Sequence, residues 1–152
     1  MTALLIGLGN VDRGDDAVGI EVARRVAALD RAGVDVVETS DPTALLDLWT
    51  DAERVVVVDA MVSHRAPGVV ESFDVADVDL PAGDWAGGGS HALGLGAAVR
   101  LSRALGRMPR HLVVVGVEIG AVEPTATMSP AVAAATDVAV RTALAALADG
   151  DD

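Results

Sequence analysis

The 152-residue sequence predicts an α/β domain with a mainly parallel sheet, on three observations. Short valine-rich runs alternate with longer segments whose apolar residues recur at helical spacing. One run holds four consecutive valines, which is typical of a parallel strand buried on both faces. Hydrophobic residues make up 51% of the chain but aromatic residues only 2%, so aliphatic side chains must fill the core. We expect one domain over residues 1–152, in three layers, with a twisted sheet of about five strands and helices on both faces.

The first half of the chain alternates strands and helices. Strands are expected at residues 2–8, 34–39 and 54–62, and helices at 16–29 and 41–49. The Asp-Pro pair that opens the second helix is a common helix start, because proline suits the first turn.

The second half begins with an antiparallel edge strand and ends with a long helix. In order, we expect a strand at 69–73, a loop at 74–89, a helix at 90–105, a strand at 111–119, a loop at 120–128, a helix at 129–148 and a frayed tail at 149–152.

Composition and charge exclude several kinds of function. The absence of cysteine excludes disulfides, thiolate metal sites and a cysteine nucleophile. All 11 basic residues are arginine, so no lysine is present for Schiff-base or P-loop chemistry. The net charge of −12 disfavours nucleic acid, and we expect no stretch long and apolar enough to cross a membrane. We therefore expect a monomer in the cytoplasm that binds neither nucleic acid nor membranes.

Polar residues follow the predicted strands, at the edge where open α/β sheets hold their active sites. Asn10, Asp15 and Asp16 follow the first strand, Asp59 directly follows the four valines, and Glu118 lies near the end of a later strand. The Asp15–Asp16 pair could simply cap the next helix, and Asp59 could be a turn carboxylate. However, an ionised group beside a dry core needs a partner. These residues alone do not choose between Asp15 and Asp16 as a ligand.

Among the three histidines, His91 is the best candidate ligand. We expect it in the first turn of its helix, capped by Ser90, where the helix dipole favours the neutral imidazole that binds metals. His111 precedes its strand and should lie at the opposite edge of the sheet. His64 follows a strand at the correct edge and is a second, weaker candidate ligand. Two carboxylates and one imidazole can form an open site for zinc or nickel.

Other catalytic schemes fit less well. The sequence has neither a G-x-S-x-G elbow nor an H-E-x-x-H motif. Residues 7–9 begin a dinucleotide fingerprint, but Asp12 replaces the third glycine and would repel a pyrophosphate.

The ordered set of motifs resembles the hydrogenase maturation endopeptidases, which process nickel–iron hydrogenase large subunits. The motifs are G-x-G-N at 7–10, D-D-x-x-G at 15–19, a hydrophobic strand ending in D-A at 59–60, S-H-x-x-G-L at 90–95, VEIG at 117–120 and MSP at 128–130. Each motif is modest, whereas their order over nearly the whole chain is specific.

This resemblance implies a cytoplasmic, metal-dependent, aspartic-type endopeptidase that removes a C-terminal extension from a precursor already loaded with nickel. It implies that Asp16, Asp59 and His91 contact the metal and carry catalysis. Supporting roles would fall to Asn10, Asp15 and Glu118. The nickel would come with the precursor, and zinc or cadmium could replace it.

Two positions depart from the family pattern. Asp16 stands where the family often has glutamate, and Ala17 where glycine is common. Two other functions also fit the sequence. Residues 7–10 resemble the opening of peptidyl-tRNA hydrolases, an esterase family, although Val11 and Asp12 replace the usual Pro-Gly and the acidic charge opposes RNA binding. A non-catalytic metal-binding checkpoint of maturation would use the same ligands.

The proposed site makes a geometric prediction. Strands 2–8 and 54–62 should be adjacent and parallel, with the winding of the chain reversing between them. Their carboxyl ends would then form one crevice holding Asp16 and Asp59, which His91 should reach from the start of its helix.

Overall fold

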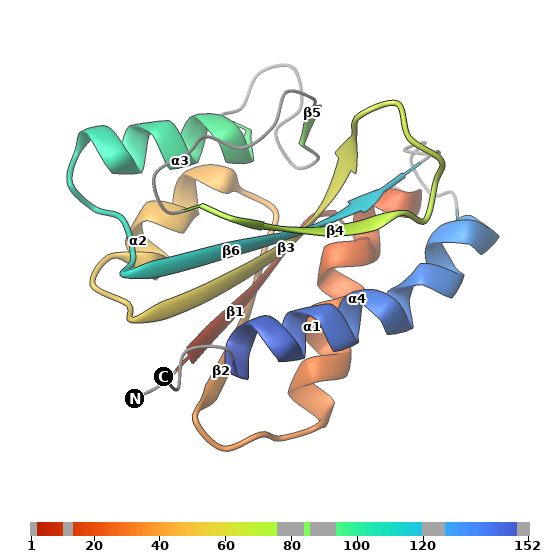
Figure 1. Cartoon of the computed structure of the whole chain (residues 1–152), viewed down its shortest axis with the longest axis horizontal. Coiled ribbons are helices and arrows are strands. Elements are labelled where there is room, and N and C mark those ends of the chain that lie inside the picture. Colours follow the sequence, from red (N-terminus) through yellow and green to blue (C-terminus); the bar gives the residue numbers. More distant parts are fainter. Residues whose placement is uncertain (1–2, 11–13, 76–83, 86–93, 120–126, 149–152) are drawn as a thin grey trace.

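The computed structural model has three layers, with a central sheet between two pairs of helices (Figure 1). It describes residues 3–10, 14–75, 84–85, 94–119 and 127–148. Helices α1 (Val18–Ala28) and α4 (Pro130–Ala148) cover one face, while α2 (Leu45–Trp49) and α3 (Leu95–Ala104) cover the other. The predicted α/β class is therefore confirmed.

The main strands of the sheet lie in the order β2-β1-β3-β6-β4. Pairing is parallel from β2 through β1 and β3 to β6, whereas β4 runs antiparallel to β6 at the edge. The strands are β1 (Ala3–Leu8), β2 (Val34–Thr39), β3 (Arg54–Val62), β4 (Val70–Asp74) and β6 (His111–Glu118). The predicted bounds of β2 and β3 are confirmed, and β4 is the predicted antiparallel edge strand.

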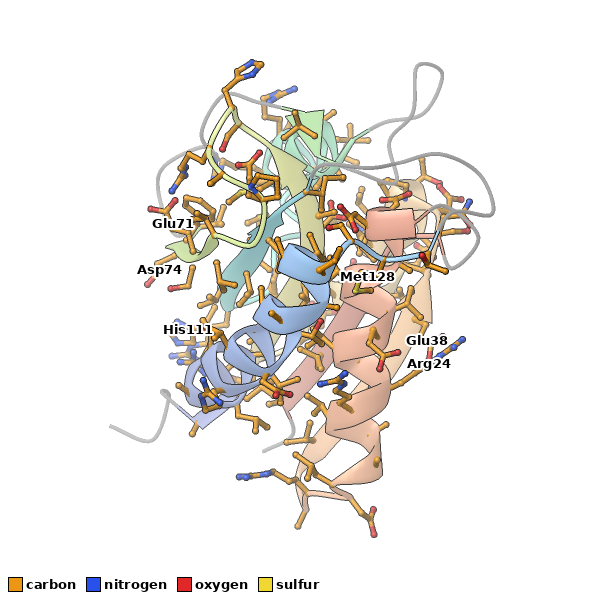
Figure 2. All side chains as sticks on the ribbon, turned by 90° about the vertical axis from the view of Figure 1, so that its right-hand side faces the viewer. Arg24, Glu38, Glu71, Asp74, His111 and Met128 are labelled. Atoms are coloured by element: carbon orange, nitrogen blue, oxygen red, sulfur yellow. The ribbon has the colours of Figure 1, made fainter. Side chains whose placement is uncertain are left out.

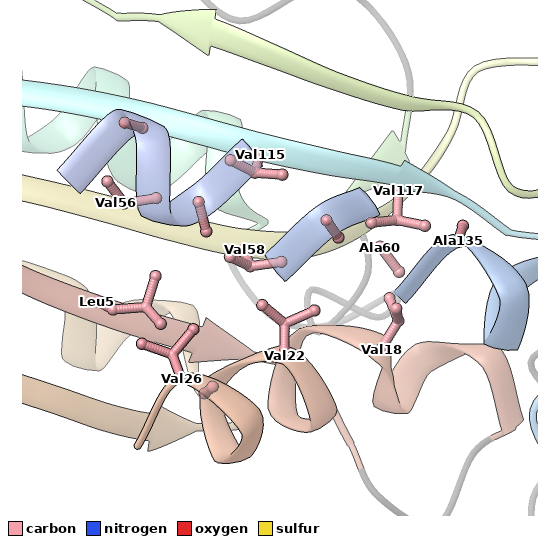
Figure 3. Close-up of a cluster of buried hydrophobic side chains, with 14 of the residues drawn as sticks. Leu5, Val18, Val22, Val26, Val56, Val58, Ala60, Val115, Val117 and Ala135 are labelled. Atoms are coloured by element: carbon pink, nitrogen blue, oxygen red, sulfur yellow. The ribbon is translucent and has the colours of Figure 1, made fainter. Parts of the chain in front are cut away.

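Strand β3 is buried on both faces, as its four valines predict. Val56 and Val58 pack into the core under α1 and α4, whereas Val55 and Val57 pack into the core under α2 and α3. Figure 3 shows the first of these cores, where Val22 of α1 points toward the sheet. All four valines are fully buried, so the alternation of a strand supplies both layers of the core.

The predicted neighbours β1 and β3 are adjacent and parallel, with Leu5 paired to Val56 and Gly7 to Val58. Strand β2 lies on the other side of β1, and β6 on the other side of β3. The winding of the chain thus reverses between β1 and β3, which confirms the geometric prediction for the sheet. Their carboxyl ends share one edge, the usual place of an active site in such sheets.

The first two helices begin differently from their prediction, each with a 3₁₀ turn. The helix predicted at 16–29 starts as η1 (Gly14–Ala17), and α1 follows. The helix predicted at 41–49 starts as η2 (Pro42–Ala44), where the Asp41 carboxylate accepts the Thr43 N–H at 3.0 Å. The Asp-Pro signal for a helix start is therefore confirmed.

The third helix, α3, begins later than the prediction of residue 90. Its N-cap is Gly94, which is extended with φ −74° and ψ 174°. Among the described residues of this region, Leu95, Ala98 and Val99 of α3 pack into the core on the sheet. The N-cap of α3 is thus Gly94 and not Ser90 as predicted, and the first turn of α3 does not include His91. Ser90 and His91 themselves lie outside the described residues.

Two further expectations need correction. The loop predicted at 74–89 contains a short strand, β5 (Asp84–Trp85), antiparallel to β3. It can pair there because β3 extends beyond its last partner in β1 and so has a free edge. Helix α4 has 19 residues and a mean hydropathy of 1.5, so by length and composition it could span a membrane, contrary to the sequence prediction. In the structure, one face of α4 packs on the sheet.

Candidate active site

Asp59 interrupts the apolar run of β3 near the carboxyl edge of the sheet. Its side chain is fully buried, and neither carboxylate oxygen has a hydrogen-bond partner within the described part of the chain. Burial raises the pKa of Asp59 well above its usual range, and the nearby charge of Asp16 raises this pKa further. The neighbouring Ala60 N–H, although it makes no hydrogen bond of normal geometry to the carboxylate, lowers this pKa in part. Such a carboxylate favours either a proton or a bound cation.

The two aspartates of η1 have different surroundings. Asp15 is fully buried, and its oxygens accept the Ser129 backbone N–H at 2.6 Å and the Ser129 hydroxyl at 2.9 Å. Asp16 is 4% exposed and acts electrostatically on Asp59. Neither aspartate caps α1, whose N-cap is Ala17 without a side-chain hydrogen bond. Neither aspartate is thus the N-cap of α1, and Asp16 is the member of the pair whose charge acts on Asp59.

Close backbone packing holds η1 against the sheet. A Cβ at Gly9 would lie 2.2 Å from the carbonyl oxygen of Asp16, and the Asn10 N–H donates to that same oxygen at 3.1 Å. A Cβ at Gly19 would lie 2.4 Å from two carbonyl oxygens, that of Leu8 at the end of β1 and that of Val58 in the middle of β3. Because only glycine permits such approaches, the glycines of the two N-terminal motifs bring Asp16 to the edge that holds Asp59.

Glu118 anchors the chain that follows β3. It is 1% exposed, and its carboxylate accepts the Ser63 backbone N–H at 2.8 Å and the Ser63 hydroxyl. Its own backbone binds residues further along the same connection, since its N–H donates to Val69 and its carbonyl accepts from Gly68. These bonds engage the Glu118 carboxylate in fixing the β3–β4 connection.

The histidines have three different outcomes. His111 pairs with Arg54 at the amino end of β3, which confirms that it lies at the opposite edge of the sheet; Figure 2 labels it. His64 is exposed on the β3–β4 connection and has a positive φ of 69°. His91 lies outside the described residues, so its approach to the two carboxylates stays a prediction.

A shallow groove of about 300 Å³ adjoins η1 at the ends of β1 and β2. Its lining residues are Gly9, Asn10, Ile20, Arg24, Glu38, Thr39 and Ser40. Arg24 and Glu38 form a two-bond ion pair at its rim, at 3.1 and 3.2 Å, and lie together in Figure 2. The sequence analysis did not predict this pair. The polar residues at the end of the 34–39 strand could have indicated a groove at this edge of the sheet.

The chemistry of Asp16 and Asp59 suits a divalent cation. Two buried carboxylates in one place repel each other unless a positive charge or a proton lies between them. Within the described ranges, no third histidine, aspartate or glutamate completes a cluster with them. A complete three-ligand site would therefore need a ligand from another part of the chain, where His91 is a candidate.

Comparison with known proteins points to one family. The family model described as hydrogenase maturation protease matches residues 20–146. The Hydrogenase 2 maturation protease of Escherichia coli (strain K12) is 32% identical to the chain over 154 residues, with 97% of this chain and 91% of that protein covered.

Solved structures point the same way. The hydrogenase maturating endopeptidase HybD from E. coli is similar with a TM-score of 0.79 and 25% identity, covering 99% of this chain and 94% of that one. The [NiFe] hydrogenase maturation protease HybD from Thermococcus kodakarensis has a TM-score of 0.74 at 25% identity, covering 97% and 99%.

Proposed function

This chain belongs to the hydrogenase maturation protease family, and we propose that it removes the C-terminal extension of a nickel-loaded nickel–iron hydrogenase large-subunit precursor. Membership makes it a hydrolase that cleaves peptide bonds, and it argues against the peptidyl-tRNA hydrolase alternative. The dependence on metal and the substrate are our proposal. We further infer that the precursor supplies the nickel, that zinc or cadmium can replace it, and that the enzyme acts as a monomer in the cytoplasm.

The observation that supports metal recognition is the buried Asp16–Asp59 pair. Both carboxylates are buried, and the charge of Asp16 raises the cost of ionising Asp59. A precursor that carries a divalent cation supplies the positive charge that lets both carboxylates be ionised on docking, whereas a precursor without one leaves Asp59 to keep its proton. The pair can therefore discriminate between loaded and unloaded precursors.

The proposed ligands are Asp16, Asp59 and His91, with Asp59 giving up its proton on binding. The metal would polarise the scissile carbonyl or activate a water molecule. Asn10 lines the groove beside η1 and is suited to hold the backbone of the precursor. Asp16 carries one methylene less than the glutamate common in the family, and the close contact of its carbonyl with Gly9 brings its backbone near the sheet.

The test is a cleavage assay on the full precursor, prepared with and without nickel, with the products weighed by mass spectrometry. We expect wild type to trim only the nickel-loaded form. Asp16→Asn and Asp59→Asn keep the side-chain shapes but lose ligand charge, and His91→Ala loses the imidazole. Each should abolish trimming while the circular dichroism spectrum stays that of a folded protein.

Two results would contradict this proposal. Equal trimming of the nickel-free precursor by wild type would show that the metal is not recognised. Binding of the loaded precursor without any cleavage would instead support the non-catalytic checkpoint.

A further inference from the structure

A contact between Asp15 and Ser129 ties η1 to the start of α4, across 114 residues of sequence. Both oxygens of the fully buried Asp15 are used, one by the Ser129 N–H at 2.6 Å and one by its hydroxyl at 2.9 Å. Hydrogen bonds to an ionised acceptor are stronger than neutral ones, and a negative charge at the N-terminus of a helix is favoured. These two hydrogen bonds therefore fix the position of η1 relative to the start of α4.

The tie gives η1 a second anchor besides the sheet. At the end of β1, the Asp16 carbonyl accepts the Asn10 N–H at 3.1 Å and leaves room only for glycine at residue 9. At the start of α4, Ser129 binds Asp15. The next residue, Asp16, is thereby fixed between two elements that the rest of the fold places independently.

We propose that Asp15 is a positioning residue, which clamps η1 between β1 and α4 and so holds Asp16 in place to share a metal with Asp59. Its own carboxylate is engaged by Ser129 and is not a ligand. The part of this proposal that concerns the metal rests on the proposed function, whereas the clamp itself does not.

A second tie between the same regions provides a matched control. Arg25 of α1 binds Asp137 of α4 at 2.6 Å, but both side chains are largely exposed and lie away from η1. Asp137→Asn therefore loosens α1 from α4 without touching the turn that carries Asp16.

The first measurement is amide hydrogen exchange of the apo protein by NMR. The Asn10 N–H reports the position of η1, because its acceptor is the Asp16 carbonyl. Asp15→Asn puts an amide group against two donors, so we expect exchange at Asn10 to speed up roughly tenfold or more while amides of β3, such as that of Val57, change less. Asp137→Asn should leave Asn10 unchanged relative to β3.

The second measurement is calorimetry with Ni²⁺. Residues that orient metal ligands typically change affinity 10–100-fold when replaced, so we expect Asp15→Asn to weaken Ni²⁺ binding by about that range. Ser129→Ala keeps the backbone donor and should weaken it roughly fivefold, whereas Ser129→Thr should restore it. The double variant should bind no worse than Asp15→Asn alone, since both changes break one contact.

Exchange at Asn10 that changes only as much as exchange in β3 would overturn the clamp. Ni²⁺ affinity that Asp15→Asn leaves unchanged would overturn its role in placing Asp16 for the metal. A loss of affinity in Asp15→Asn that Ser129→Ala does not share would also overturn that role, because Asp15 would then itself be a ligand. Failure of wild type to cleave the loaded precursor, together with faster local exchange at Asn10 in Asp15→Asn, would refute the proposed function and leave the clamp standing.

Discussion

At the scale of single residues, three of the four buried carboxylates described near this edge have clearly distinct environments. Asp15 is satisfied by Ser129, and Glu118 by Ser63. The Asp59 carboxylate has no such partner among the described residues. Burial thus costs stability at Asp59 that it does not cost at the other two, which is expected where a residue serves function rather than folding.

The raised pKa of Asp59 predicts an unusual pH dependence of stability. The pKa of Asp59 lies above the ordinary 3.8, so the folded state binds the proton of this carboxyl group more tightly than the unfolded state does. The contribution of Asp59 to the free energy of unfolding therefore falls as pH rises from that value toward its folded pKa. We expect Asp59→Asn to remove this fall and to be at least as stable as wild type at neutral pH, although inactive.

Urea unfolding of the apo proteins from about pH 4 to about pH 8 checks this prediction, because the difference between the two stability curves isolates Asp59. The difference should grow in favour of Asp59→Asn as pH rises. Parallel curves would show that the buried carboxyl titrates alike in the folded and unfolded states.

At the scale of elements, a buried hydrogen-bond chain joins the two helices on the face opposite α1 and α4. The Trp49 Nε1–H of α2 donates to the Ser102 hydroxyl of α3 at 2.9 Å, and that hydroxyl donates to the Arg107 carbonyl at 2.8 Å. Both side chains are fully buried. The hydroxyl thus lets the largest side chain of this core enter it without an unpaired donor.

Ser102→Ala should therefore destabilise the protein by about 1–3 kcal/mol, because it leaves the buried indole N–H and the Arg107 carbonyl without their partner. Thr142→Ala is a matched control, since its hydroxyl also donates to a helix carbonyl, at 2.8 Å, but near the surface. We expect that change to stay within about 0.5 kcal/mol. Urea unfolding compares the two, and equal effects would contradict the argument.

At the scale of the whole molecule, glycines set how closely α1 lies on the sheet. A Cβ at Gly7 would lie 2.5 Å from the Gly19 carbonyl oxygen, and a Cβ at Gly19 would lie 2.4 Å from carbonyl oxygens of both Leu8 and Val58. The helix, β1 and β3 therefore meet backbone to backbone. This contact sets the distance between η1 and β3, and with it the distance between the two candidate ligands.

Gly19→Ala should cost about 3 kcal/mol or more, since backbone atoms rather than flexible side chains would have to move. It should also weaken Ni²⁺ binding by shifting η1. Gly96→Ala is the matched control, because its Cβ would meet only the end of the Arg100 side chain at 3.4 Å. That change lies in α3 and should be neutral or stabilise the protein by up to about 1 kcal/mol.

Thermal unfolding and calorimetry on both variants decide this prediction. A Gly19→Ala protein as stable as wild type would show that the close approach is not needed.

The sequence by itself determined every described strand except β5, the order of those strands and the helices, and the places where polar residues follow strands. The reason is that these predictions rest on the spacing of apolar residues, the valine runs and the Asp-Pro pair. Each of these depends only on residues that are close together in the sequence. The adjacency of β1 and β3 also followed, because the rules of α/β winding leave few alternatives. The sheet edge that carries Asp16 and Asp59 could thus be located without a structure.

Only the tertiary structure decided what each carboxylate contacts. Asp15 and Asp16 are equivalent in sequence, and they differ because Ser129 reaches one of them while β3 carries Asp59 to the other. The partner of Glu118 and the late start of α3 were likewise hidden, since both depend on how distant layers pack. The local sequence pattern determines the local backbone conformation. The protonation and hydrogen bonding of a buried carboxyl group depend instead on groups from distant parts of the chain, which only tertiary packing brings near it.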